Sequence, residues 1–312
     1  MGTKAYKYLR SASVEKVSAE AGTCAFKCSY PRDFNDPYEL FLTVDYEQDP
    51  EVPAYYHEVI GAIPQLATTC FSKSPEVVPM WAHYAENHTG VVIEVDEDCV
   101  LERYPEIAFG DVDYRDGADP DILKALHHAI GTKKPRHTYI VQKAVLSAAY
   151  YTKLLSWSYE QERRLLARPE ETVTVDGNVL VRMPIRCVTS LIVGFRATAE
   201  TKSAVKELSA RNRCRYLEMK VGRTRAKPFF VDEKGNVWVF EGGQFIESAS
   251  VCESCGEPIH DGKDQCSWCA MTPEDADQAA RQNPMRMLAN YELLEGYYRD
   301  MAEIDRRHRK PK

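Results

Sequence analysis

The hydrophobic pattern alternates between short apolar runs and amphipathic stretches, which predicts a mixed α+β domain. Strand-like runs occur at 68–72 (TTCFS) and in the GVVIEVD block that ends at Asp96. Apolar residues at helical spacing predict a long helix over about 136–156. Residues 157–167 (WSYEQERRLLA) and 183–195 (MPIRCVTSLIVGF) each predict a strand. Because these strands differ in length and character, a regular βαβ array is not expected.

Capping and turn signals mark the ends of several predicted helices. A helix from about Pro79 is expected to end at Gly90, in the left-handed conformation common just past a helix. Asp119 and Pro120 predict the start of another helix, which Gly131 would stop. The other signals in the chain are N-caps at Thr198 and Thr272 and a hairpin turn at 234–236.

Length and composition exclude several classes of protein. The 312 residues carry 40 Lys and Arg against 47 Asp and Glu, a net charge of −7, which excludes a uniformly basic nucleic-acid binder. No apolar run approaches the roughly 18 residues of a membrane span, and the N-terminus lacks a hydrophobic signal region. We therefore expect a cytoplasmic protein without a membrane partner. Six of the ten cysteines are expected to be buried free thiols: Cys24, Cys28, Cys70, Cys99, Cys187 and Cys214.

The clearest chemical motif is a double CxxC, which predicts a structural zinc site. Cys252 and Cys255 form one pair, and Cys266 and Cys269 form the second pair ten residues later. Four thiolates satisfy a tetrahedral zinc ion, and such closed sites are structural rather than catalytic. A zinc ribbon can bind nucleic acid, dock a protein or stabilise a domain, so it leaves the function open.

The motif also divides the chain into three parts. The predictions are a main domain over 1–247, a zinc ribbon over 248–271 and a C-terminal helical segment with a basic tail over 272–312. The last segment contains apolar residues at four-three spacing, which favours one helix that packs on its own domain. These residues are Met287, Tyr291, Leu294, Tyr298 and Met301.

One stretch of the acidic chain is strongly basic. Residues 196–227 contain ten Lys and Arg and three Asp and Glu, a local balance of +7. Such a contrast favours a surface for nucleic acid or a nucleotide, to which the zinc ribbon could contribute. The alternative is an ordinary solvated face.

Two glutamates separated by one residue are the candidate catalytic carboxylates. On a strand, Glu160 and Glu162 would point to the same face, which is unfavourable unless a cation or a reaction requires them. The alternative is ion pairing with Arg163, Arg164 or the basic stretch. Common nucleotide-binding and hydrolase motifs (GxGxxG, GxxxxGK[ST] and GxSxG) are absent from the sequence.

Five sequence blocks occur in an order that resembles the bacterial family known as domain of unknown function 2971. The resemblance covers about residues 5–220, and its most specific parts are the FNDPYE and MWAHYAENHTG blocks. The blocks are YKYLR at 6–10, FNDPYE at 34–39, CFS at 70–72, MWAHYAENHTGVVIEVD at 80–96 and WSYEQERRL at 157–165.

That family in turn resembles the NAD-dependent ADP-ribosyltransferase fold, which implies a split-sheet architecture and NAD as substrate. The likeness implies that Glu162 offsets positive charge on the ribose and that Glu160 orients or deprotonates the acceptor. It implies that Ser72 bridges Glu162 and the ribose, and that Arg10 or Lys7 holds the pyrophosphate. Leu9 separates the tyrosine-lysine-tyrosine run from Arg10, so the choice between the two cations stays open.

Four further residues complete the implied NAD pocket. Tyr84 and His83 could stack on nicotinamide or simply pack at a helix end, while Tyr8 and Asn35 could shape the pocket. Proteins of this fold include bacterial toxins and phage-defence effectors, so an antitoxin or another partner protein is conceivable. The competing hypothesis is a non-catalytic nucleic-acid-binding or adaptor protein that uses the ribbon and residues 196–227.

Overall fold

A computed structural model describes the chain in two compact units, Met1–Ser248 and Ala249–Lys312. The described residues are 2–17, 20, 22–36, 47–61, 65–259 and 262–308. Residues 37–39 of the FNDPYE block, His260 and the last four residues of the basic tail lie outside them. None of the helices in this described part is long and apolar enough to cross a membrane.

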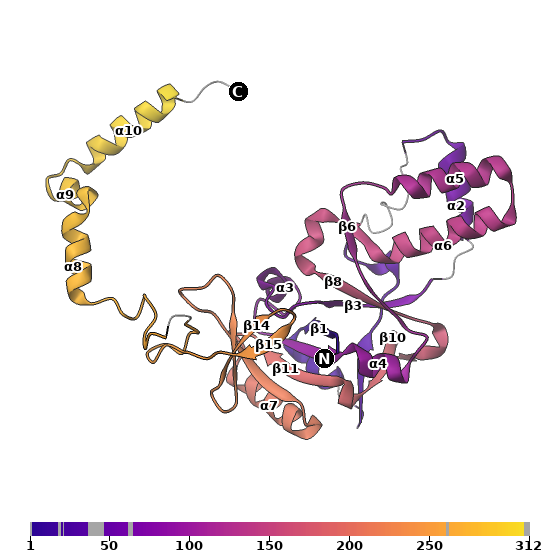
Figure 1. Ribbon diagram of the computed structural model, residues 1–312, viewed down its shortest axis with the longest axis horizontal. Coiled ribbons are helices and arrows are strands. Elements are labelled where there is room, and N and C mark those ends of the chain that lie inside the picture. The colour runs from indigo at the N-terminus through magenta and orange to yellow at the C-terminus, as the bar shows by residue number, and fades with distance from the viewer. Residues whose placement is uncertain are drawn as a thin grey trace. The chain divides into compact units, whose positions relative to one another are not determined.

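A curled sheet of ten strands forms the centre of the first unit (Figure 1). Most of its strands are short and apolar, as expected for strands with both faces covered. In spatial order they are β15 (Gln244–Glu247), β14 (Val237–Glu241), β13 (Phe229–Asp232), β12 (Arg215–Lys220), β11 (Val188–Val193), β4 (Val91–Asp96), β1 (Lys4–Leu9), β3 (Ala67–Ser72), β8 (Glu162–Ala167) and β5 (Ala108–Asp111). With the helices around this sheet, the unit has the mixed α+β character that the sequence pattern predicts.

The sheet is almost divided between β1 and β3. β1 pairs with β4 along its whole length, and β3 pairs with β8 over six residues. Between β1 and β3, by contrast, only Tyr6 and Ser72 are paired. The two strands therefore diverge on either side of this pair, and side chains rather than backbone bonds fill the opening.

Two smaller sheets and seven α-helices complete the described part of the first unit. The three-stranded sheet consists of β2 (Thr23–Lys27), β10 (Asn178–Pro184) and β9 (Thr172–Val175), and the two-stranded sheet of β6 (Asp113–Arg115) and β7 (Thr152–Leu154). The helices are α1 (Val14–Val17), α2 (Glu51–Gly61), α3 (Val78–His83), α4 (Glu97–Arg103), α5 (Pro120–Thr132), α6 (Pro135–Tyr151) and α7 (Ala199–Asn212). Apolar clusters cover both faces of the large sheet, and α2, α5 and α6 enclose a third cluster of their own.

The capping signals locate helix starts better than helix ends. Asp119 caps α5 and Thr198 caps α7 through their side-chain oxygens, as predicted. Gly131, however, lies inside α5, which ends one residue later with Lys133 in the left-handed conformation. The prediction that Gly131 stops the helix was therefore wrong.

The helix predicted up to Gly90 is also shorter than expected. α3 ends at His83, and the following turn places Glu86, Asn87 and His88 at positive φ. Gly90 itself has no positive φ, but an added Cβ there would lie 2.2 Å from the carbonyl oxygen of Leu9. A close approach of two backbones, and not a left-handed cap, therefore explains this glycine.

Two predicted strands are interrupted. Residues Leu155–Glu160 form a 3₁₀-helix, and only Glu162–Ala167 form β8. The apolar run at 183–195 contains the end of β10, a short 3₁₀-helix over Ile185–Cys187 and then β11. The sequence pattern predicted strands in these segments but could not show where their backbones turn.

Two of the six cysteines predicted to be free thiols form a disulfide. The structure pairs Cys99 on α4 with Cys187 in the 3₁₀-helix before β11, with their Cα atoms 5.4 Å apart. They lie 88 residues apart in sequence, so no local pattern indicated the pairing. The prediction holds for the other four, Cys24, Cys28, Cys70 and Cys214, which are free and buried or half-buried.

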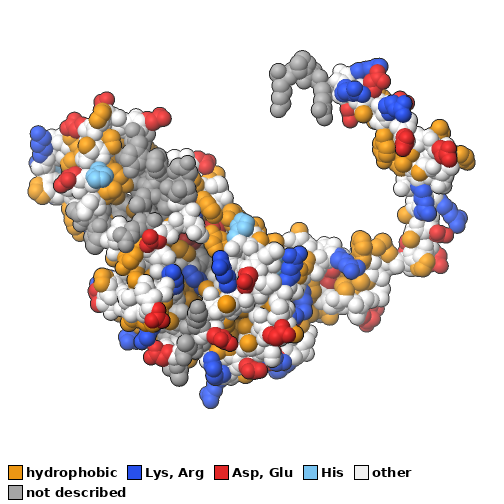
Figure 2. All heavy atoms as spheres, turned by 180° about the vertical axis from the view of Figure 1, so that it is seen from behind, with side chains coloured by type: hydrophobic (Ala, Val, Ile, Leu, Met, Phe, Trp, Pro, Cys, Tyr) orange, Lys and Arg blue, Asp and Glu red, His pale blue; other side chains and the backbone are white. Residues whose placement is uncertain are grey.

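The second unit consists of a cysteine-rich loop region and three helices, α8 (Pro273–Gln282), α9 (Pro284–Asn290) and α10 (Leu294–His308). Thr272 caps α8 as predicted. The single helix expected beyond Pro284 is two helices, and none of the three has a buried residue. Within this unit, the side chains of Met287, Tyr291 and Tyr298 are exposed. Figure 2 shows such apolar side chains at the surface of the helical segment.

The contact at Gly90 predicts a specific loss of stability. Gly90→Ala should lower the free energy of unfolding by about 1–3 kcal/mol, because the added methyl group would collide with backbone atoms of Leu9 and Ala85. Urea denaturation would measure this loss. Gly131→Ala is the matched control, since a Cβ there meets nothing within 4 Å and alanine favours a helix. Equal stability of Gly90→Ala and the wild type would contradict the prediction.

Candidate functional site

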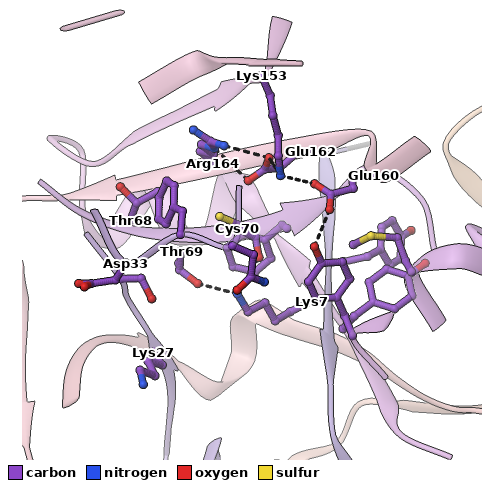
Figure 3. Close-up of a pocket in the computed structure, with 18 residues that line it drawn as sticks. Lys7, Lys27, Asp33, Thr68, Thr69, Cys70, Lys153, Glu160, Glu162 and Arg164 are labelled. Carbon is purple, nitrogen blue, oxygen red and sulfur yellow. Dashed lines mark hydrogen bonds and ion pairs between the residues drawn. The ribbon is translucent and has the colours of Figure 1, made fainter. Parts of the chain in front are cut away.

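A pocket of about 190 Å³ contains most of the residues that the sequence singled out. Its lining comes from both sides of the opening between β1 and β3, together with segments before and within β8. The polar residues that matter below are Lys7, Lys27, Thr69, Tyr84, Lys153, Glu160, Glu162 and Arg164. Seven of these eight are labelled in Figure 3.

The two candidate carboxylates reach the pocket from different elements. Glu160 ends the 3₁₀-helix, Glu162 begins β8, and Gln161 between them has a φ of 47°. The premise that one strand carries both glutamates was therefore wrong. The left-handed turn at Gln161 nevertheless directs both side chains into the pocket, where each residue is only 3% exposed.

Lys153 on β7 lies between the two carboxylates. Its Nζ is 2.6 Å from Oε2 of Glu160 and 3.4 Å from Oε2 of Glu162. Figure 3 shows Lys153 pointing toward these two glutamates. Two carboxylates so close together repel each other unless a cation offsets their charge. Lys153 provides that cation and offsets the negative charge of both side chains.

Arg164 holds Glu162 from the other side and is fully buried. Its Nε and Nη2 lie 2.9 and 3.1 Å from the two oxygens of Glu162, and its Nη1 donates to the carbonyl oxygen of Tyr150. Burial by itself would raise the pKa of Glu162, but Arg164 and Lys153 outweigh it and lower this pKa to about 2. Glu162 is therefore ionised at neutral pH.

The basic residue of the first strand that lines the pocket is Lys7. Its Nζ donates to Oγ1 of Thr69 at 2.9 Å and to the carbonyl oxygen of Cys70 at 2.7 Å, across the opening between β1 and β3. Burial lowers its pKa, and among the described residues no carboxylate forms an ion pair with it. Arg10, the alternative, follows the end of β1, is exposed and does not line the pocket.

Ser72 and Tyr8 differ in their access to the pocket. Ser72 lies opposite Glu162 in the β3–β8 register and is fully buried, but it does not line the pocket. Its Oγ accepts a hydrogen bond from the backbone amide of Ser74. Tyr8 does line the pocket, and its hydroxyl donates to the carbonyl oxygen of the same Ser74. Ser72 therefore lies beside Glu162, but a ligand in the pocket would not contact it.

Tyr84 and His83 also differ in their access to the pocket. The hydroxyl of Tyr84 donates to Oε1 of Glu160 at 2.6 Å and lies in the pocket. His83 is exposed, does not line the pocket and has its Nδ1 3.3 Å from the hydroxyl of Tyr159. Asn35 lines the pocket, as the sequence allowed.

Sequence reasoning missed Lys153 and Lys27, and it treated Arg164 only as a possible ion-pair partner. Lys153 is a single cation in an otherwise apolar segment, and Arg164 lies two residues after Glu162 and hence on the same strand face. A buried cation in such a segment requires a charge partner, and this requirement could have predicted its pairing with Glu160 or Glu162. Lys27 carries no comparable local signal.

Comparison with known proteins identifies one family over part of this site. The model of a family described as "Protein of unknown function (DUF2971)" matches residues 80–165. This range runs from α3 into β8 and includes Tyr84, Glu160 and Glu162. It supports the family resemblance for that segment. No curated protein and no solved structure matches the chain significantly.

Four cysteines form a second candidate site, in the C-terminal unit. The Sγ atoms of Cys252, Cys255, Cys266 and Cys269 all lie within 4.8 Å of one another, so they could hold a metal ion. Sγ of Cys255 and Sγ of Cys266 are 3.8 Å apart, close to the edge of about 3.8 Å of a tetrahedron with Zn–S bonds of about 2.3 Å. Gly256 follows the first pair at a φ of 71° and permits the tight turn of the loop.

The electrostatics of the four thiols also fit a divalent cation. The backbone amide of Cys266 donates to Sγ of Cys252 and lowers the pKa of that thiol to about 6. Hydrogen bonds with Cys266 and the other neighbouring thiols raise the pKa of Cys269 to about 12. Four thiolates this close cannot all ionise by themselves, whereas zinc would offset their charge.

The basic stretch 196–227 is mostly engaged in ion pairs. At least six of its ten cations have a carboxylate within 4 Å among the described residues: Lys202, Lys206, Arg215, Lys220, Arg225 and Lys227. Figure 2 shows Lys and Arg side chains interspersed with Asp and Glu on that view of the molecule. The positive charge that this stretch could offer to a nucleic acid is therefore smaller than its composition suggests.

The low pKa of Glu162 predicts a pH dependence of stability. Its pKa of about 2 lies below the ordinary value of 4.5, so the ionised carboxylate stabilises the fold above about pH 4.5. This contribution, about 3 kcal/mol, is lost as the pH falls toward 2. Glu162→Gln should therefore be less stable than the wild type near neutral pH, and the difference should narrow in acid, as chemical denaturation at several pH values would measure.

Glu97 provides a matched control for this experiment. It is an equally buried carboxylate paired with an arginine of β8, Arg163, but burial raises its pKa. The stability of the wild type relative to Glu97→Gln should therefore increase as the pH falls. The same pH trend in both variants would show that the Glu162 ion pair does not have the strength inferred here.

The cysteine cluster predicts about one equivalent of zinc per chain in protein purified without added metal. Elemental analysis would measure it, and Cys252→Ser or Cys266→Ser should lose the metal because three thiolates hold it less tightly. Cys214→Ser, which changes a cysteine outside the cluster, should keep it. Metal-free wild-type protein, or full metal content in the two cluster variants, would refute the zinc site.

Proposed function

We propose that the chain is an ADP-ribosyltransferase-like enzyme that breaks the bond between nicotinamide and ribose in NAD. The observation that carries this proposal is the meeting of Lys7, Glu160 and Glu162 in one pocket at the opening between β1 and β3. Lys7 lies more than 150 residues before the glutamates in the sequence. A local ion pair on β8 would not require the first strand to bring a lysine there.

The ionised Glu162 suits the charge that develops in this reaction. When the bond breaks, its electron pair leaves with nicotinamide, and C1′ of the ribose becomes electron-deficient, as in glycoside cleavage. A fixed carboxylate beside that carbon stabilises the transition state more than the neutral-sugar ground state. Arg164 and Lys153 keep Glu162 ionised and in place, although they also share its negative charge.

Glu160 is suited to the incoming group. Its oxygens accept hydrogen bonds from Tyr84 at 2.6 Å and from Lys153 at 2.6 Å, which fix the orientation of the carboxylate. A hydroxyl or water that attacks C1′ must lose a proton, and a carboxylate at hydrogen-bond distance can accept it. The products are then nicotinamide and an ADP-ribosylated acceptor, or free ADP-ribose when water attacks.

The size of the pocket suggests how much of NAD it would enclose. Its volume of about 190 Å³ is below the about 300–1,000 Å³ usual for complete ligands of moderate size. It could therefore hold the nicotinamide and ribose end, while the rest of the dinucleotide lies outside. Lys7 and Lys27 form no ion pair with a carboxylate in the described part of the chain, and they could bind the pyrophosphate.

Nicotinamide release from NAD tests this proposal. Glu162→Gln should slow release by about a hundredfold or more with little change in NAD affinity, because an amide can bind ribose but cannot offset positive charge. Glu160→Gln should slow the reaction less with water as the acceptor and more with the true acceptor, because Glu160 orients or deprotonates the incoming group. Folding of each variant would be checked by circular dichroism at the same temperature.

Glu97→Gln is again the matched control, because it removes a buried carboxylate from an arginine of β8 but leaves the pocket unchanged. It should release nicotinamide at nearly the wild-type rate. Equal rates in the wild type and folded Glu162→Gln would refute the role of this carboxylate. A wild-type protein that neither binds nor cleaves NAD would refute the proposed function as a whole.

A further inference from the structure

A second hollow lies on the large sheet and shares no lining residue with the first pocket. It has a volume of about 410 Å³ and is formed by β1, β4, β11, β12 and the β14–β15 hairpin. The side chains that decide its chemistry are Arg215, Glu94, Thr189 and Gln244. Its size falls within the range of about 300–1,000 Å³ that is typical of small-molecule sites.

The guanidinium of Arg215 is held in a fixed orientation in this hollow. Its central carbon lies 5.1 Å from the ring centre of Trp238 and 4.9 Å from that of Phe245. Its Nε donates to Oγ of Ser190 at 3.3 Å. A guanidinium stacked and oriented in this way loses little conformational freedom when it binds a ligand.

The nearby carboxylate does not satisfy Arg215. The oxygens of Glu94 already accept hydrogen bonds from the hydroxyls of Tyr6, Thr189 and Ser190, at 2.9, 2.6 and 2.5 Å. Nη2 of Arg215 lies 3.9 Å from Oε2 of Glu94, which is beyond hydrogen-bond distance. Within the described part of the chain, the Nη atoms therefore have no hydrogen-bond acceptor, and the side chain is 34% exposed.

We infer that this hollow binds a small organic oxyanion, a phosphate or carboxylate ester or acid, on the fork of Arg215. Two parallel N–H donors match the spacing of two oxygens in either group. Lys4, which lines the hollow, adds positive potential, although its Nζ is paired with Asp96 at 2.5 Å. Gln244, which also lines the hollow, is exposed and offers an amide donor to the body of the ligand.

Binding of three probes tests the site: inorganic phosphate, glycerol 3-phosphate and succinate, each at constant ionic strength. Calorimetry on the full chain should show binding of at least one probe, and the comparison of the phosphates with succinate distinguishes the two oxyanion classes. Arg215→Gln should weaken that binding about tenfold or more, because it removes a charge-assisted pair of hydrogen bonds. Arg211→Gln makes the same charge change at an arginine outside this hollow and should bind like the wild type.

Two further variants keep the test decisive. Gln244→Glu places a negative charge in the hollow from an exposed hairpin position, so it should weaken binding even if Arg215→Gln does not fold. Lys27→Gln changes the first pocket and should leave the affinity unchanged. The inference is wrong if no probe binds at millimolar concentration, if Gln244→Glu binds like the wild type, or if Lys27→Gln alone abolishes binding.

Discussion

A fully buried arginine determines what the rest of the pocket must contain. Removing an unpaired guanidinium from water costs several kcal/mol, so the groups around Arg164 must accept its hydrogen bonds. Glu162 supplies both carboxylate oxygens, and the end of α6 supplies a backbone carbonyl. Lys153 then brings a second cation, which Glu160 balances. The buried charges of β7, β8 and the 3₁₀-helix thus depend on one another, and removal of one leaves its neighbour without a charge partner.

The opening between β1 and β3 gives this charged cluster access to a ligand. A continuous ladder would have used the carbonyl group of Cys70 for backbone pairing, but here that oxygen accepts from Lys7. The single pair formed by Tyr6 and Ser72 keeps the two parts of the sheet in register. The sheet therefore supplies a rigid frame on both sides of the pocket, and side chains form the wall of the pocket. Such a frame positions reactive groups more firmly than a surface loop does.

Local sequence signals predicted the elements that local chemistry determines. Thr198 and Thr272 cap helices because each oxygen reaches an amide within the next turn. The cysteine cluster follows equally from the spacing of its two CxxC pairs. The left-handed Gln161 and the disulfide of Cys99 have no such signal, because each depends on segments that are distant in the sequence. The sequence therefore indicated the two glutamates, but it could not show that they come from different elements.

The order of strands in the large sheet has a consequence for folding on the ribosome. β4 ends at Asp96, yet its neighbour β11 is complete only at Val193, roughly a hundred residues later. At about 5–20 residues per second, the edge of β4 stays without this partner for roughly 5–20 s of synthesis. Val91, Val92 and Ile93 are fully or almost fully buried in the finished sheet, and an open apolar edge of this kind pairs readily with other chains. The nascent chain therefore carries an open apolar strand edge while residues 97–193 are being made.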